Sequence, residues 1–315
     1  MKVVVTGAAG FIGSHTCEAL VARGHAVVGV DSFDGFLYPA EIKRRNAAGL
    51  RGVTMIEADI CDQRAMNEAI AGTDVVCHLA ALAGVRPSIA EPHAYVRTNL
   101  HGTATILEAI RATGGARLVF ASSSSVYGAR SLDGAQAFRE DDPCLRPASP
   151  YAATKRAGEL LCSTYRDLHG LGVSSLRFFT AYGPRGRPDM AVYKFVDGIA
   201  HDRAIAVYGD GSTRRDYTFV TDIAAGVAAA CERVTPGAYE IYNLGNTRTV
   251  SLAEMIAECE AVVGKKARID RQPEQPGDVP ITYADITRAV RDLDYRPQTD
   301  FATGLRAFYA WYRTI

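Results

Sequence analysis

The sequence predicts an α/β protein with a doubly wound parallel sheet and a smaller α/β unit on its C-terminal side. Short apolar runs of the type that forms buried strands alternate with longer helix-like stretches, and this alternation is typical of parallel sheets covered by helices. A glycine-rich turn directly after the first run supports the same fold. The expected strands are Val3–Thr6, Ala26–Val30, Val53–Glu57, Val75–Leu79, Arg117–Ala121 and Val173–Phe178.

Each expected strand is followed by, or alternates with, a helix-like stretch, and the clearest are Gly13–Arg23, Ala94–Ala112 and Tyr151–His169. The alternation weakens after about Phe179, where Gly, Pro and Arg become dense. A later helix at Thr221–Glu232 and a strand at Tyr239–Leu244 are expected to return to the first unit. We therefore expect one domain from residues 1–178 with a return segment at about 219–245, and a second from residues 179–218 and 246–315.

Composition excludes several classes of protein. The chain has 315 residues, with 35 basic and 35 acidic side chains and a formal net charge of zero, so general attraction to nucleic acid or to a membrane surface is not expected. Its seven cysteines are scattered without metal-ligand spacing, which predicts neither a disulfide framework nor a metal site and fits a reducing cytoplasm. The sequence shows no long apolar stretch of the kind that spans a membrane.

The glycine loop near the N-terminus predicts a dinucleotide site. Gly7, Gly10 and Gly13 stand between the first expected strand and the first expected helix. Glycines at such a turn let the backbone approach a pyrophosphate, which the positive end of the helix stabilises. Asp31 ends the next strand, where a carboxylate accepts hydrogen bonds from the adenosine ribose and repels a 2′-phosphate. The loop therefore predicts NAD rather than NADP as cofactor.

Tyr151 and Lys155 form a candidate proton-transfer pair. They are four residues apart at the start of an expected helix, so their side chains leave the same face. An ammonium beside a phenol favours the phenolate, so we expect Lys155 to lower the pKa of Tyr151. This would make Tyr151 a proton shuttle near neutral pH.

Taken together, these motifs resemble the extended short-chain dehydrogenase/reductase family along essentially the whole chain. The Gly-x-x-Gly-x-x-Gly spacing, the run Ser122–Gly128 and Tyr151-x-x-x-Lys155 carry the resemblance. It implies a Rossmann sheet, with Ser123 as the third catalytic residue beside Tyr151 and Lys155. For the cofactor it implies contacts from the loop, the strand ends and a helix asparagine, namely Gly7, Gly10, Phe11, Ile12, Gly13, Asp31, Asp59, Ile60, Leu79, Ala80, Ala81, Asn99, Tyr151 and Lys155.

The second half resembles the nucleotide-sugar enzymes of this family. The segment Tyr208–Tyr217 is similar to their nucleotide-binding signature, which implies that Arg215 contacts the diphosphate; a guanidinium fork suits phosphate oxygens. The loop Pro276–Pro280 implies that Asp278 holds the nucleotide ribose. Many 4-epimerases carry an arginine where this chain has Gln275, and Arg271 is a candidate replacement.

The serine run separates possible reactions. Sugar 4,6-dehydratases of the family carry Asp-Glu where this chain has Ser124 and Ser125, so dehydration is not expected. Decarboxylases carry a glutamate in place of Ser125, which argues less strongly against decarboxylation. The remaining reaction is 4-epimerisation, in which one base and a hydride carrier suffice.

The residues around the expected sugar site favour UDP-glucuronate as substrate. Phe178–Met190 and Ala83–Arg86 are similar to the glucuronate 4-epimerase pattern. The implied substrate contacts are Arg86, Ser124, Ser125, Thr180, Arg187, Arg215 and Asp278. The expected reaction is conversion of UDP-glucuronate to UDP-galacturonate by transient oxidation at C4, with Tyr151 as acid and base.

The sequence is also compatible with other functions. They are 4-epimerisation of UDP-glucose or UDP-N-acetylglucosamine, decarboxylation of UDP-glucuronate, net NAD-dependent dehydrogenation of a nucleotide sugar, and NAD sensing without catalysis. The family resemblance also implies a homodimer, formed through helices 94–112 and 151–169.

Overall fold

The fold is organised around a seven-stranded parallel sheet. The computed structural model describes residues 1–129, 136–274 and 279–315. In spatial order the strands are β10 (Tyr239–Leu244), β6 (Val173–Phe178), β5 (Arg117–Ser123), β4 (Val75–His78), β1 (Lys2–Thr6), β2 (Ala26–Asp31) and β3 (Val53–Glu57). The order reverses direction between β1 and β4, so this is the doubly wound sheet that the sequence predicts. All seven strands match the expected positions to within two residues.

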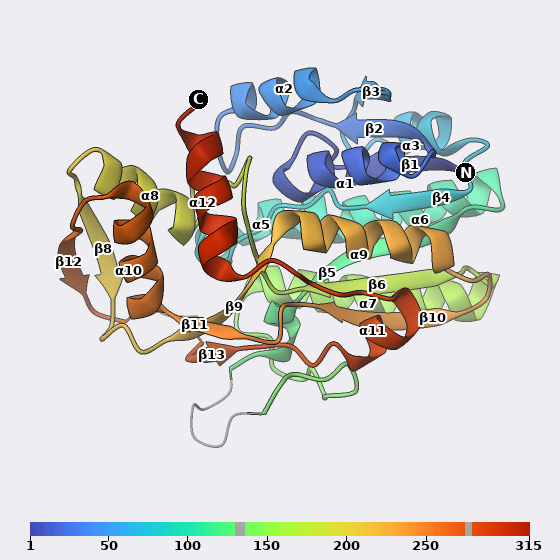
Figure 1. The fold of residues 1–315 in the computed structure, drawn as a ribbon. Helices are drawn as coiled ribbons and strands as arrows, with labels where there is room; N and C mark the ends of the chain where they lie inside the picture. Colours follow the sequence, from blue (N-terminus) through green and yellow to red (C-terminus); the bar gives the residue numbers. More distant parts are fainter. Residues whose placement is uncertain (130–135, 275–278) are drawn as a thin grey trace.

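Helices cover both faces of this sheet (Figure 1). One face packs on α1 (Phe11–Ala22), α9 (Val220–Arg233) and α11 (Thr287–Leu293), and the other on α3 (Gln63–Ile70), α6 (Gly102–Thr113) and α7 (Pro150–His169). Because α11 contributes Ala289 and Leu293 to the core of the large sheet, part of the C-terminal segment also returns to the first unit. The expected boundary of 246–315 for the second unit did not include this return.

A smaller unit follows the sixth strand and has its own core, to which Phe195, Tyr217 and Phe308 belong. Figure 1 shows it as a separate lobe beside the large sheet, with α8 and α10 next to the β8–β12 pair. It contains two small sheets, formed by β7 (Thr180–Tyr182), β9 (Arg214–Phe219), β11 (Thr249–Ser251) and β13 (Ile281–Thr282), and by β8 (Ala204–Tyr208) with β12 (Arg268–Gln272). Its helices are α8 (Ala191–Ala200), α10 (Leu252–Val263) and α12 (Phe301–Tyr312).

The expected helix at 94–112 is a composite of three segments. It consists of α5 (Pro92–Tyr95), a π-helical turn η1 (Val96–His101) and α6. Short helical segments also occur at α2 (Ala40–Gly49), at α4 (Val85–Ala90) and in a 3-10 turn η2 (Ser124–Tyr127). In the parts of the chain that the structure describes, no helix combines the length and the apolar character that crossing a membrane requires.

Candidate active site

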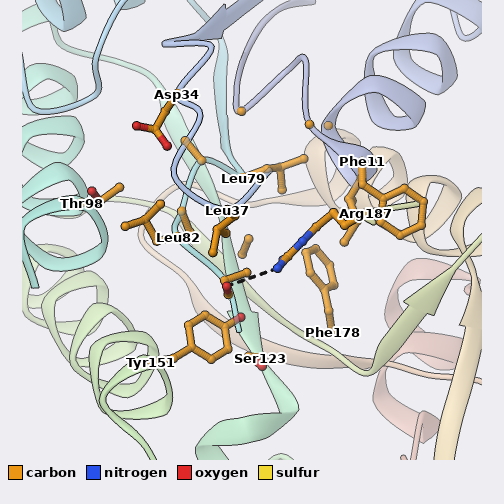
Figure 2. Close-up of a pocket in the computed structure, with 18 of the residues that line it drawn as sticks. Phe11, Asp34, Leu37, Leu79, Leu82, Thr98, Ser123, Tyr151, Phe178 and Arg187 are labelled. Atoms are coloured by element: carbon orange, nitrogen blue, oxygen red, sulfur yellow. Dashed lines mark hydrogen bonds between the residues drawn. The ribbon is translucent and has the colours of Figure 1, made fainter. Parts of the chain in front are cut away.

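A cavity of about 470 Å³ lies at the carboxyl ends of the parallel strands, where doubly wound folds bind their ligands. It brings together most of the residues that the sequence singles out. Figure 2 shows Phe11, Leu79, Ser123, Tyr151 and Arg187 around one hollow, although they come from distant parts of the chain. The predicted residues that line it are Gly7, Gly10, Phe11, Ile12, Gly13, Asp31, Asp59, Ile60, Leu79, Ala80, Ala81, Ser123, Ser124, Ser125, Tyr151, Lys155, Thr180 and Arg187.

The glycine loop has the geometry of a cradle for a diphosphate. Gly7 has φ +71°, and a Cβ placed there would lie 2.8 Å from the Ala80 backbone nitrogen. A Cβ on Gly13 would overlap the Gly7 carbonyl, so the turn and the first turn of α1 can only pack this closely without side chains. Helix α1 follows the loop, and the positive end of its dipole can stabilise an anion bound at its N-terminus.

Asp31 closes the other side of the cradle at the end of β2. Its Oδ2 accepts the Ala9 backbone N–H at 3.0 Å and its Oδ1 accepts that of Phe33 at 2.9 Å, which fixes the carboxylate next to the loop. A carboxylate accepts up to about four hydrogen bonds, so a ribose hydroxyl can still bind it. The cradle and this carboxylate together fit the adenosine half of NAD.

Asn99 supports the cavity from behind. It is 3% exposed; its Oδ1 accepts the Leu82 N–H at 2.8 Å, and its Nδ2 donates to the Leu82 carbonyl at 2.9 Å. The same amide donates to Thr154 Oγ1 at 3.1 Å, which joins the π-helical turn to α7 beside Lys155. These bonds order the wall of the cavity, and the predicted contact of Asn99 with the cofactor stays a prediction.

Ser123 and Tyr151 lie next to each other in the cavity (Figure 2), so that the Ser123 hydroxyl is placed to hydrogen-bond the Tyr151 phenol. Burial raises the pKa of Tyr151 above its usual range, while the bond with Ser123 and the charge of Arg187 pull it down. The expectation that the pKa of Tyr151 lies below its free value is therefore wrong for this structure. The groups that stabilise the phenolate are Ser123 and Arg187, and desolvation outweighs them.

Lys155 is 4% exposed and points to the end of β5. Its Nζ donates to the Ala121 carbonyl at 2.7 Å and lies 5.2 Å from the centre of the Phe120 ring. Burial lowers its pKa to about 8, and the charge of Glu159 one turn further along α7 raises it. The lysine is thus a mainly charged group near neutral pH, and it ties α7 to the strand that ends in Ser123.

Hydroxyl groups and one cation form the part of the cavity expected to hold the sugar. Ser123 Oγ donates to Ser125 Oγ at 3.1 Å, and Ser124, Ser125 and Thr180 all line the cavity. Arg187 Nη2 donates to the Ala83 carbonyl at 3.3 Å, while Asp189 binds the same guanidinium through both carboxylate oxygens. This region can hold a polar or anionic substituent with neutral donors and one shared charge.

Two predicted substrate residues lie outside the described lining of the main cavity, and a third is not described. Arg215 lines a smaller neighbouring cavity of about 170 Å³ that shares Phe11, Thr180 and Arg187 with the main one. Arg86 is not among the described lining residues of either cavity, and its guanidinium stacks 4.3 Å from the centre of the Tyr208 ring. Asp278, like Gln275, lies outside the described residues.

The structure adds lining residues that the sequence reading missed. Leu37 and Tyr38 come from the loop after β2, Arg97 from the π-helical turn, and Lys43 from α2. Arg97 Nη2 donates to Asp59 Oδ2 at 2.8 Å at the end of the cavity where Ile60 also lies. These residues belong to no recognisable motif. The only sequence signal for such lining residues is the occurrence of polar residues shortly after β2 and β3, where the chain leaves the carboxyl ends of the strands.

The fold and the cavity define a Rossmann-type enzyme with a Ser–Tyr–Lys set beside a dinucleotide cradle. The model of the NAD dependent epimerase/dehydratase family matches residues 3–245, and the chain belongs to this family.

Several relatives align over nearly the whole chain. "Protein CapI" of Staphylococcus aureus is 39% identical over 99% of this chain and 98% of its own length. "UDP-glucuronate 4-epimerase 4" of Arabidopsis thaliana is 40% identical over 99% of this chain and 75% of its own length. The solved structure of UDP-glucuronic acid 4-epimerase from Bacillus cereus, in complex with UDP-glucuronic acid and NAD, has a TM-score of 0.92 and 36% identity over 100% of this chain and 99% of that one.

Proposed function

We propose that this chain is an NAD-dependent UDP-sugar 4-epimerase that interconverts UDP-glucuronate and UDP-galacturonate. The observation that carries the proposal is the single cavity that contains the glycine cradle, the Ser123–Tyr151 pair and the polar group around Arg187. The relatives named as UDP-glucuronate 4-epimerases support the same substrate.

In the proposed reaction, Tyr151 removes the proton from the sugar 4′-hydroxyl and later returns a proton to the 4′-oxygen. Bound NAD would accept the C4 hydride and give it back. Ser123 donates a hydrogen bond to the 4′-oxygen where negative charge develops. Arg187 stabilises the phenolate form of Tyr151, and Lys155 holds α7 against the end of β5. The 4-keto sugar turns between the two transfers, so that its other face receives the hydride and C4 is inverted.

The other predicted contacts keep their roles as proposals. We assign the cofactor to the lining residues from Gly7 to Ala81 named above, together with Tyr151 and Lys155, and the diphosphate to Arg215. Residues 1–178 and the return segment at about 219–245 would bind the cofactor, and residues 179–218 with 246–315 would bind the nucleotide sugar, apart from α11. Arg86 would act at the rim of the site through its stacking on Tyr208.

A substrate panel tests this proposal. Purified protein is incubated with UDP-glucuronate, UDP-glucose and UDP-N-acetylglucosamine, and the products are separated by chromatography. We expect UDP-galacturonate from UDP-glucuronate, without accumulation of free NADH. Failure to form UDP-galacturonate would refute the substrate, whereas a steady release of NADH would indicate a net dehydrogenase.

Epimerisation of UDP-glucose is the second candidate. One observation favours it: the charge of Arg187 is already neutralised by Asp189, so the sugar region has no full unpaired cation among the described lining residues that form it. The UDP-glucose 4-epimerase of Thermus thermophilus, whose structure was solved with NAD, has a TM-score of 0.90 and 32% identity over 99% of both chains. The same panel separates the two substrates.

We also propose that the protein forms a homodimer through η1 and α7. These two segments pack against each other and expose apolar side chains, with Val96 at 48%, Leu160 at 53% and Leu168 at 70% exposure. Large exposed apolar side chains on adjacent helices are a common feature of subunit interfaces. Light scattering of the wild type and of a Leu160→Asp variant tests this, with a dimer expected for the first and a monomer for the second.

A further inference from the structure

The arginine of the sugar region is held by a carboxylate from its own loop. Arg187 Nε donates to Asp189 Oδ1 at 2.9 Å, and Nη2 donates to Asp189 Oδ2 at 2.5 Å, so the carboxylate binds the guanidinium along one edge. Only Pro188 separates the two residues. Arg187 lines the cavity, whereas Asp189 is not among its described lining residues. Asp189 therefore acts on the cavity through Arg187.

This arrangement limits what Arg187 can offer to a ligand. A guanidinium has five N–H donors, and its strongest contact with a carboxylate uses two nitrogens at once. Asp189 occupies Nε and one donor of Nη2, and the Ala83 carbonyl accepts from Nη2 at 3.3 Å. Nη1 has no hydrogen bond to the residues that the structure describes. An incoming carboxylate could thus bind Nη1 but could not form the contact that uses two nitrogens at once.

The charge of the guanidinium is shared in the same way. The carboxylate of Asp189 compensates the positive charge of Arg187. The charge of Arg187 also acts electrostatically on the nearby phenols of Tyr38, Tyr95 and Tyr151. A carboxylate that enters this region meets a neutral pair. Its attraction to the pair is much weaker than its attraction to an unpaired guanidinium in a cavity of low dielectric.

A weak contact suits the proposed reaction. The 4-keto sugar has to turn between the two hydride transfers, and its carboxylate moves with the ring. A two-nitrogen ion pair with an unshared Arg187 would favour one orientation of the sugar strongly and slow this turn. Shared with Asp189, the guanidinium can attract the carboxylate without fixing it.

We propose that Asp189 is a positioning residue that competes with the sugar carboxylate for Arg187 and keeps the carboxylate loosely held, so that the keto sugar can turn. This inference rests on the proposed function and adds a specificity device to it. Asp189 lowers the affinity for the acidic sugar and raises the turnover number. For a neutral sugar it leaves the affinity unchanged, because a neutral sugar does not compete for the guanidinium.

The test compares Asp189→Asn with a matched control, a carboxylate on α1 that binds another arginine of the same loop. The substitution keeps one acceptor oxygen for Arg187 and removes the charge. Glu18→Gln is the control, because Glu18 holds the neighbouring Arg185 through both oxygens, at 2.9 and 2.5 Å, and neither residue lines the described cavities. Binding of UDP-glucuronate and UDP-glucose is measured by calorimetry in the Tyr151→Phe background, and kcat and KM are measured with Tyr151 intact.

For Asp189→Asn we expect UDP-glucuronate to bind about tenfold more tightly while UDP-glucose binds as before. We also expect kcat and KM for UDP-glucuronate to fall together. The control should leave all four quantities unchanged. Equally weakened binding of both sugar nucleotides would show that the pair only supports the fold. Unchanged binding and turnover would show that Asp189 does not compete for Arg187. Either result overturns the proposal. If the wild type forms no UDP-galacturonate, the proposed function fails, but the binding ratio still decides the role of Asp189.

Discussion

One arginine–carboxylate pair lies beside Tyr151 and a second lies further along α7, and they differ in how much solvent reaches them. Arg177 on β6 binds Glu159 on α7 at 2.8 and 2.9 Å, and both side chains are at most 1% exposed. Arg187 binds Asp189 with similar geometry, but these side chains are 14% and 27% exposed and the arginine faces the cavity. The same kind of ion pair is thus a structural element sealed from solvent at Arg177 and Glu159, and a solvent-accessible part of the site at Arg187 and Asp189.

The sealed pair is surrounded by protein on every side that the structure describes. Glu159 also accepts hydrogen bonds from Ser122 Oγ at 2.5 Å and Arg156 Nη1 at 2.8 Å, and Arg177 lies 4.7 Å from the centre of the Tyr127 ring. These bonds join α7, which carries Tyr151, to the end of β5, which carries Ser123. Burial therefore decides the role of each ion pair. The fully buried pair fixes the arrangement of the elements around it, whereas the partly exposed pair affects the electrostatics of the reaction.

Removal of the sealed arginine should have the largest effect on stability. In Arg177→Met the Glu159 carboxylate loses two buried bonds, and we expect the free energy of unfolding to fall by about 3–5 kcal/mol. Urea denaturation measures this. Arg203→Met is the control, because Arg203 pairs with Asp197 on the surface, with side chains 59% and 31% exposed; it should cost less than about 1 kcal/mol. Equal losses in the two variants would contradict the distinction between the pairs.

Removal of the cavity arginine should affect catalysis more than stability. We expect Arg187→Gln to lower kcat/KM for UDP-glucuronate by about a hundredfold, which corresponds to roughly 2.7 kcal/mol. The free energy of unfolding should fall by less than in Arg177→Met, since Asp189 is partly exposed to solvent and can be hydrated when it loses its partner. Steady-state kinetics and urea denaturation on the same preparation measure both. A stability loss as large as that of Arg177→Met would show that this pair is structural too.

The same variant should shift the pH dependence. The charge of Arg187 lowers the pKa of Tyr151, so its removal raises that pKa and less phenolate is present at a given pH. The acidic limb of the kcat profile should therefore move to higher pH, by about one unit. Profiles of the wild type and of Arg187→Gln are compared with the Glu18→Gln control. An acidic limb that stays in place would exclude electrostatic control of Tyr151 by Arg187.

A smaller effect is expected at the Ala83 carbonyl, which accepts hydrogen bonds from both Arg187 and Tyr95. Tyr95 is buried, its hydroxyl donates to the Ala83 carbonyl at 2.9 Å, and its ring packs edge-on to that of Tyr151 at 6.3 Å. Tyr95→Phe keeps the ring and should cost about 1 kcal/mol of stability and a few-fold in kcat. The effect should be small, because Arg187 still donates a hydrogen bond to the Ala83 carbonyl in this variant. No change in kcat would show that the position of the Ala83 carbonyl does not affect the site.

The sequence predicted the parts of the site that depend on local chain geometry. The glycine cradle and Asp31 belong to one strand–turn–helix–strand unit, and Tyr151 and Lys155 share one helix face, so their spacing alone places them together. Ser123 was placed by resemblance to a strand-end motif. Each of these residues lines the cavity.

The remaining features depend on contacts between distant segments. No spacing rule could show that Asn99 would bind Leu82 and Thr154, or that Arg86 would stack on Tyr208. The pKa of Tyr151 was predicted with the wrong sign because the extent of its burial cannot be read from a helix position. The competition between Asp189 and a substrate for Arg187 likewise becomes visible only in three dimensions.

The central claim is that Tyr151 acts as base on one face of the sugar and as acid on the other. The most direct measurement is the conversion of UDP-glucuronate and, separately, of UDP-galacturonate by the wild type and by Tyr151→Phe. The account predicts that the wild type reaches the same mixture from either side and that the variant is slower by about a thousandfold in both directions. A variant that keeps most of its activity, or that loses only one direction, would contradict it.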